Sequence, residues 1–150
     1  MQIERRRMLL AAAGAALVAG RAGAALAAAA PPVTVYKNVA CGCCGGWVEH
    51  MRRSGFEVRV VDVPDVSPYK RRLGVPDELA SCHTAEIGGY AIEGHVPAAD
   101  IRRLLRERPS AAGLALPGMV PSSPGMEGPR TPYATLVFSA DGRAGVFERH

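Results

Sequence analysis

Short apolar segments separated by glycine and proline give the first half of the chain the pattern of an α/β protein. Val33–Tyr36 and Phe56–Val63 are rich in β-branched and aromatic residues, which predicts two strands. Between them, apolar residues recur at helical spacing from Trp47 to Arg52, and Ser54-Gly55 is expected to end this helix. Cysteines and glycines fill Cys41–Gly46, which predicts a loop between the first strand and the helix.

The second half adds a helix, a hairpin and another helix. A short helix is expected over Ser67–Leu73. Strands over Thr84–Ile87 and Tyr90–Glu93, joined by a Gly-Gly turn, predict a hairpin. Apolar residues from Ala98 to Leu105 predict a helix that stops before Pro109. Strand, helix, strand, helix, hairpin, helix is the element order of a thioredoxin-like α/β domain.

A long segment of different composition follows the last predicted helix. Gly113–Pro132 contains nine prolines and glycines in twenty residues and repeats Pro-Gly-Met at positions 117–119 and 124–126. Loops of this length within a domain are usually functional or disordered. Thr135–Ser139 and Ala144–Glu148 then predict a closing hairpin. We therefore expect a single thioredoxin-like α/β domain with an added Pro/Gly/Met-rich loop and a C-terminal hairpin.

The N-terminal residues 1–30 have the features of an export signal. Arg5–Arg7 is basic, and Met8–Gly20 is apolar and uncharged. As a helix this run would cover roughly 20 Å, which is shorter than a bilayer core of about 30 Å. Small residues around Ala25–Ala27 offer cleavage sites, so the mature domain is expected to be 31–150, in the periplasm. The arginines also resemble a twin-arginine signal, and an uncleaved anchor is the alternative.

Once residues 1–30 are set aside, the charge composition gives no support for binding to nucleic acid or to an anionic membrane. The chain has 18 basic and 14 acidic residues, of which four and one lie in residues 1–30, so the mature part has 14 against 13. A nearly neutral domain gives no reason to expect nucleic acid or an anionic membrane as partner. The length of 150 residues fits one domain.

Three of the four cysteines are clustered between the first predicted strand and helix. Cys41 and Cys44 form a C-x-x-C motif at the expected helix start, where free N–H groups and the helix dipole lower thiol pKa values. Thiolate attacks disulfides and also binds soft metals. A redox pair needs only two sulfurs, so Cys43 is better explained by a metal. Two structural disulfides in an oxidising compartment are the alternative.

Cys82 is expected to complete this cluster. In a thioredoxin-like domain the loop before the third strand lies against the start of the C-x-x-C helix, and here that loop is Ser81–Thr84. Cys82 should then lie within a few ångströms of the other cysteines. His83 is a candidate ligand, although a histidine beside a strand is more often solvated or hydrogen-bonded. His95 is a weaker candidate.

The two loop methionines add soft sulfur atoms. Met119 and Met126 lie in the Pro-Gly-Met repeats rather than on an apolar helical face. Thiolate with thioether selects Cu(I) over harder cations, and thioether argues against zinc. Both residues are therefore candidate copper ligands or shields, and packing against the core is the alternative.

Several spaced motifs together resemble the CopG-like family of periplasmic copper-resistance proteins. The resemblance runs from about Val33 to Phe147 and implies a thioredoxin-like fold, copper bound through the cysteines, and a redox role in copper handling. The functional cysteines of that family correspond to Cys41, Cys43, Cys44 and Cys82. The motifs are Cys41-Gly42-Cys43-Cys44-Gly45, Cys82-His83-Thr84-Ala85, Gly89-Tyr90, Ile92-Glu93-Gly94-His95-Val96-Pro97, Gly113-Leu114-Ala115, Pro117-Gly118-Met119 and Ser123-Pro124-Gly125-Met126-Glu127.

Three hypotheses for function follow. The first is a periplasmic protein that holds Cu(I) on a thiolate cluster, and sequesters it or passes it to another periplasmic copper-handling protein. The second is a thiol–disulfide oxidoreductase that uses Cys41 and Cys44, with Cys82 resolving. The third is a disulfide-stabilised domain that acts through protein contacts. An oxidoreductase should tolerate Cys43→Ser, whereas a metal cluster should not, and whether the protein is an enzyme stays open.

Overall fold

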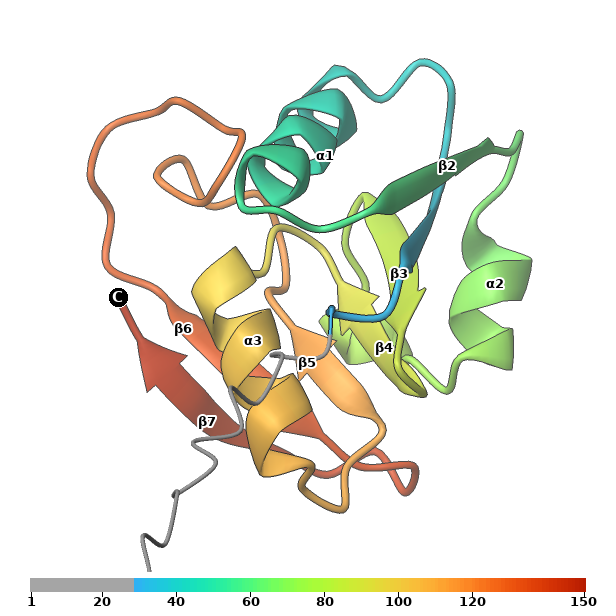
Figure 1. Cartoon of the computed structure of the whole chain (residues 1–150), viewed down its shortest axis with the longest axis vertical. Helices are drawn as coiled ribbons and strands as arrows, with labels where there is room; N and C mark the ends of the chain where they lie inside the picture. The colour runs from blue at the N-terminus through green and yellow to red at the C-terminus, as the bar shows by residue number, and fades with distance from the viewer. Residues whose placement is uncertain (1–28) are drawn as a thin grey trace, which may run out of the picture.

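A mixed seven-stranded sheet forms the centre of the computed structural model, which describes residues 29–150 (Figure 1). The export signal expected over residues 1–30 lies outside the described residues, apart from its last two positions. The strands are β1 (Val33–Lys37), β2 (Val58–Asp62), β3 (His83–Ile87), β4 (Tyr90–Glu93), β5 (Gly113–Ala115), β6 (Ala134–Phe138) and β7 (Ala144–Arg149). The helices are α1 (Gly42–Arg53), α2 (Ser67–Arg72) and α3 (Ala98–Glu107), with a single 3₁₀ turn at Asp77–Leu79.

The strand order β2-β1-β3-β4-β5-β6-β7 contains two parallel pairs. Strands β1 and β2 are parallel and joined through α1, and β4 and β5 are parallel and joined through α3. The other neighbours are antiparallel. Because β1 pairs with β3 in the register Lys37↔His83, the end of β1 lies beside the start of β3. This pairing brings together two segments that are more than forty residues apart.

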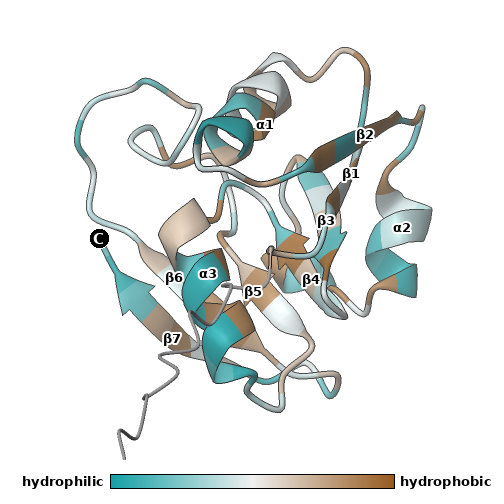
Figure 2. Cartoon of the chain, viewed as in Figure 1, coloured by the Kyte–Doolittle hydropathy of each residue, from teal (hydrophilic) through white to brown (hydrophobic). Residues whose placement is uncertain are grey.

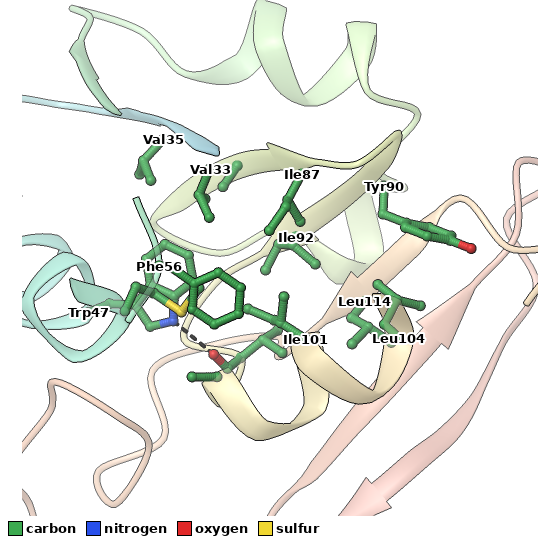
Figure 3. Packing of buried hydrophobic residues seen from close by; sticks show 14 of the residues in the cluster. Val33, Val35, Trp47, Phe56, Ile87, Tyr90, Ile92, Ile101, Leu104 and Leu114 are labelled. Atoms are coloured by element: carbon green, nitrogen blue, oxygen red, sulfur yellow. Dashed lines mark hydrogen bonds between the residues drawn. The ribbon is translucent and has the colours of Figure 1, made fainter. Parts of the chain in front are cut away.

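Helices α1 and α3 cover one face of the sheet, and their packing forms the main core. Figure 3 shows Trp47 and Phe56 packed beside Ile92 and Ile101 in this core. Hydrophobic residues line the strands, while the outward face of α3 is hydrophilic (Figure 2). A smaller cluster, built around Leu79 and including Ala91, Ala115 and Phe138, covers the opposite face. Alternate residues of β4 thus face two different layers.

Two sequence predictions were wrong in their details. The expected Cys41–Gly46 loop is instead the first turn and a half of α1, which begins at Gly42 with Cys41 as its N-cap residue. Glycine has low helix propensity, and tertiary contacts overcame it here.

The expected Gly113–Pro132 loop also begins later than predicted. Its first three residues are the buried strand β5, which pairs with β4 and β6. Gly113 lies so close to β4 that a Cβ atom there would be 1.9 Å from the Ala91 carbonyl oxygen.

No helix within residues 29–150 is long and apolar enough to cross a membrane.

Candidate metal site

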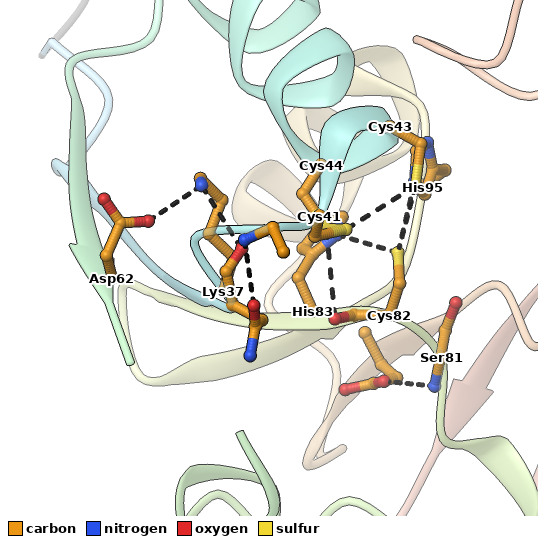
Figure 4. Close-up of a disulfide and its surroundings, with 12 residues drawn as sticks. Lys37, Cys41, Cys43, Cys44, Asp62, Ser81, Cys82, His83 and His95 are labelled. Atoms are coloured by element: carbon orange, nitrogen blue, oxygen red, sulfur yellow. Dashed lines mark hydrogen bonds and ion pairs between the residues drawn. A yellow bond between two sulfur atoms is a disulfide. The ribbon is translucent and has the colours of Figure 1, made fainter. Parts of the chain in front are cut away.

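The start of α1 holds three of the four cysteines (Figure 4). Cys41 is the N-cap residue in extended conformation, and Cys43 and Cys44 lie in the first helical turn. Cys41 and Cys44 form a disulfide, which leaves Cys43 as a free thiol 3.6 Å from the Cys41 sulfur. Only Cys44 of these three is fully buried. The turn therefore presents a disulfide and a thiol at the same helix end.

Cys82 lies directly against this turn, as its position before β3 predicted. Its sulfur is 4.0 Å from the Cys43 sulfur, and it is also a free thiol. All four cysteine sulfurs lie within 4.8 Å of one another. The pairing of β1 with β3 produces this approach, because α1 follows β1 and Cys82 precedes β3. The expectation that Cys82 lies within a few ångströms of the other cysteines is confirmed.

Two histidines extend the cysteine cluster on the side of Cys82. The Cys82 sulfur is 3.4 Å from His83 Nδ1 and 3.3 Å from His95 Nε2. One ligand atom from each of these three residues lies within 4.8 Å of the others. His83 is fully buried, and its Nε2 has no hydrogen-bond partner among the described residues. The nitrogen that lies beside Cys82 is Nδ1, so Nδ1 is the atom through which His83 could share a metal ion with this cysteine.

His95 is the functional candidate that the sequence most underestimated. Its Nδ1 is 2.7 Å from the carbonyl oxygen of Pro124, which can only accept a hydrogen bond. Nδ1 therefore donates, and Nε2 of the neutral ring has its lone pair directed at Cys82. Fixing one ring nitrogen in this way is how metal-binding histidines are commonly oriented. The only signal in the sequence was its place in the Gly94-His95-Val96-Pro97 motif.

Burial determines the protonation of the site when no metal is bound. Burial, reinforced by the nearby Cys43 thiol, raises the pKa of the Cys82 thiol to about 11. Burial also lowers the pKa of His95, and burial with His95 and Lys70 lowers that of His83 well below its usual value. The sequence predicted lowered thiol pKa values at the helix start, but Cys82 lies outside α1 and desolvation dominates there. Both imidazoles are neutral near pH 7, as metal binding requires.

Two hydrogen bonds hold α1 in place above the cluster. Trp47 Nε1 donates to the Val96 carbonyl oxygen at 2.8 Å (Figure 3), and His50 Nε2 accepts from the Ala98 N–H at 3.1 Å. Both partners belong to the segment that follows His95. The cysteine turn and the histidine segment are thus fixed to each other.

The Pro/Gly/Met-rich loop reaches the site through its backbone. Besides the Pro124 carbonyl oxygen at His95, Gly125 packs so closely on α1 that a Cβ atom on Gly46 would be 2.6 Å from the Gly125 carbonyl oxygen. The loop lies beside α1 in Figure 1. Met119 is 48% exposed and Met126 is half-buried, so their suggested role as ligands stays a prediction.

The donor atoms fit a soft metal ion. Thiolate and neutral imidazole suit copper, and the cluster contains no carboxylate. The disulfide withholds two of the four sulfurs, which leaves Cys43, Cys82 and the two histidines as available donors. Reduction would make all four sulfurs available. A mixed α/β domain with this cluster defines a candidate metal-binding protein of the thiolate class.

Comparison with solved structures identifies the family. A structure titled "Copper resistance protein copG- Form 2" matches with 41% identity and a TM-score of 0.76, covering 81% of this chain and 98% of that chain. A second, titled "Copper resistance protein copG- Form 1", matches with 44% identity and a TM-score of 0.74 over the same shares. The chain belongs to the CopG family of copper resistance proteins.

A protein-family model gives a second, shorter match. The model, described as "Protein of unknown function, DUF411", matches residues 79–126. This range contains Cys82, His83 and His95 together with both loop methionines. The comparison with curated proteins found no match.

Proposed function

We propose that this protein is an exported copper-resistance protein that binds Cu(I) on a thiolate cluster of Cys41, Cys43, Cys44 and Cys82. The single observation that carries the proposal is the convergence of all four sulfurs within 4.8 Å. Membership of a copper-resistance family supports copper as the cargo. Thiolates prefer Cu(I) to Cu(II) and to harder cations. His83, His95, Met119 and Met126 are further candidate ligands.

The proposed compartment is the periplasm, with residues 1–30 as the export signal and 31–150 as one functional domain. The basic and apolar composition of the first thirty residues supports export. A thioredoxin-like core is part of the proposal, because β1, α1 and β2 form a parallel unit with the C-x-x-C motif at the helix start. Strands β3 and β4 and helix α3 then follow in the expected order. Another periplasmic copper-handling protein is the proposed partner.

The Cys41–Cys44 disulfide gives the chain a way to control its copper capacity. Two electrons and two protons from a dithiol reductant would convert the disulfide to two thiols, as the reductant becomes a disulfide. The reduced site offers four sulfurs, whereas the oxidised site offers Cys43 and Cys82. We expect the reduced protein to bind copper more tightly or in greater amount. This provides the redox role in copper handling.

Single serine variants test the copper proposal. Reduced protein is titrated with Cu(I) against a chromogenic chelator, for the parent and for Cys41→Ser, Cys43→Ser, Cys44→Ser and Cys82→Ser. Loss of at least tenfold in affinity is expected for Cys43→Ser and Cys82→Ser, and Zn(II) should bind far more weakly than Cu(I). Parental binding in both of these variants would reject the cluster.

A thiol–disulfide oxidoreductase is the second candidate function. The observation in its favour is the disulfide between Cys41 and Cys44 at the start of a helix. In this case Cys43→Ser would retain the reduction of a small-molecule disulfide by the protein, while Cys44→Ser would abolish it. If Cys43→Ser keeps both this reductase activity and the copper affinity of the parent, the oxidoreductase is favoured.

A further inference from the structure

A buried ion pair lies directly beneath the loop that carries Cys82. Glu93, the last residue of β4, is fully buried, and its Oε1 accepts from Lys70 Nζ of α2 and from the backbone N–H of Ser81, each at 2.5 Å. Lys70 is 9% exposed. Figure 4 shows Ser81 directly before Cys82, with its N–H directed away from the cysteines. The carboxylate thus holds the Ala80–Ser81 peptide unit, which lies one residue before Cys82.

Stability alone is a poor explanation for this ion pair. Desolvating two charges is costly, and a buried pair of this kind can often be replaced by apolar residues without loss of stability. Here one carboxylate oxygen carries both hydrogen bonds, whereas Glu93 Oε2 and the opposing Thr84 Oγ1 have none among the residues described. Neighbouring positions on this face are apolar, including Ala91 and Leu79. An apolar pair would suit this layer, so the charge has another use.

The position of Ser81 suggests that use. Its N–H is held by Glu93, and its Oγ donates to the Gly118 carbonyl oxygen at 2.9 Å, at the base of the Pro/Gly/Met-rich loop. On the other side, Cys82 must meet Cys43 at 4.0 Å and His95 at 3.3 Å. A shift of about an ångström in this loop would change all of these distances. The hydrogen bond from the Ser81 N–H to Glu93 is therefore well placed to set the position of the Cys82 sulfur.

We propose that Glu93 is a positioning residue for Cys82: it accepts the Ser81 N–H to fix the cysteine loop, and Lys70 holds the carboxylate in place. The proposal rests on the proposed function, since Cys82 matters as a copper ligand. Lys70 neutralises and orients the charged carboxylate, and a neutral acceptor such as glutamine needs no such partner. The proposal therefore requires a hydrogen-bond acceptor at position 93 and not the two charges. A purely structural ion pair would require the charges and not the acceptor.

Two double variants separate these roles. Lys70→Met with Glu93→Gln removes both charges and keeps an oxygen that can accept the Ser81 N–H. Lys70→Met with Glu93→Leu removes both charges and also removes the acceptor, leaving that N–H without a partner. Both variants have the same net charge, and they differ at one side chain of similar size. Asp100→Asn is a control for the loss of a buried carboxylate, because Asp100 Oδ2 is bound by Thr135 and His150 and not by the cysteine loop.

The first measurement needs no copper. The rate of Cys82 alkylation by a neutral reagent is measured in metal-free protein in which Cys41, Cys43 and Cys44 are serine. The Leu double variant should react at least threefold faster than this parent as its loop moves, whereas the Gln double variant and Asp100→Asn should stay within twofold. Equal rates in the two double variants would overturn the proposal.

The second measurement is Cu(I) affinity in the reduced protein with all four cysteines. The Leu double variant should lose about tenfold, and the Gln double variant should bind like the parent. If no variant, including the parent, binds Cu(I), the proposed function fails, yet the alkylation rates still decide the role of Glu93. If the Leu double variant does not fold, as judged by near-UV circular dichroism, Ser81→Pro removes the same N–H and Ser81→Ala serves as its control. In this case the proposal is supported if Ser81→Pro is alkylated faster and loses Cu(I) affinity while Ser81→Ala does not. It is rejected if both variants have the alkylation rate and Cu(I) affinity of the parent.

Discussion

At the scale of single residues, the site combines groups whose sequence environments are quite different. Cys43 lies in a helical turn, Cys82 in a loop before a strand, and His95 in a turn after the hairpin. The sequence predicted that Cys43 and Cys82 lie close together, because the C-x-x-C motif and the loop before a strand are recognisable patterns, although it expected a loop and not a helical turn at Cys43. His95 was undervalued, since the backbone carbonyl that orients its ring belongs to Pro124, 29 residues away.

The protonation of Cys82 predicts how copper binding depends on pH. Burial raises the pKa of this thiol to about 11, so ligation as thiolate must release a proton at lower pH. Affinity should therefore fall about tenfold for each unit by which pH decreases, for every thiol proton released. His83 and His95 contribute no slope near pH 7, because their pKa values are lowered and both rings are already neutral.

Competition titrations from about pH 8 to about pH 6 test this, with correction for protonation of the chelator. Cys82→Ser should show a shallower slope than the parent. A parent affinity that does not change with pH would contradict ligation by this thiol.

At the scale of elements, the Pro/Gly/Met-rich loop packs against α1 beside the cysteine turn. A Cβ atom on Gly46 would be 2.6 Å from the Gly125 carbonyl oxygen of the loop, which is too close. A Cβ atom on Gly45 would have no neighbour within 4 Å. Both glycines lie inside α1, where alanine is favoured over glycine by about 0.5–1 kcal/mol. Neighbouring positions in one helix thus differ only in their contact with the loop.

Alanine substitution at these two glycines should have opposite effects. Gly45→Ala is expected to stabilise the protein by about 0.5–1 kcal/mol, through the helix propensity alone. Gly46→Ala is expected to destabilise it by about 1–3 kcal/mol, because the new Cβ atom meets the Gly125 backbone. Chemical denaturation of both variants measures the difference. Equal stabilisation would mean that the loop does not pack on α1.

The two loop methionines give a further test at this scale. In Met119→Leu with Met126→Leu, leucine keeps the apolar volume and removes the sulfur. If the thioethers are ligands or shields, thermal stability of the copper-free protein should hardly change, while Cu(I) affinity or resistance to air oxidation drops. Parental copper behaviour in the double variant would assign both residues to packing.

At the scale of the whole molecule, the seven-stranded sheet joins the site to a support on its other face. The cysteine turn lies on the side of α1 and α3, whereas Lys70 and Glu93 lie on the side of α2. The segment from Glu93 to His95 passes from one side to the other. This arrangement explains how residues in separate layers act on one sulfur.

Export is the prediction that concerns the complete chain. The protein recovered from the periplasm should begin near residues 28 to 31, because the basic segment, the short apolar run and the small residues together have the composition of a cleavable signal. Intact-mass measurement checks the cleavage site. A mass that retains Met1 to Leu26, with the protein in the membrane fraction, would contradict it.

The sequence by itself determined the elements with strong local patterns and the membership of the cysteine cluster. Alternation of β-branched residues, helical spacing and turn residues are local properties, so strands β1, β3 and β4 and helix α3 lie within two residues of their expected bounds. The tertiary structure alone decided the helical state of Gly42–Gly46 and the strand at Gly113–Ala115. Gly42–Gly46 contains three glycines, and β5 is only three residues long, so both segments have weak local signals; close backbone contacts with Gly125 and Ala91 accompany their conformations. Contacts between segments that are distant in sequence also direct His95 Nε2 toward Cys82 and place Glu93 beneath Ser81. Neither contact leaves a periodic signal in the chain.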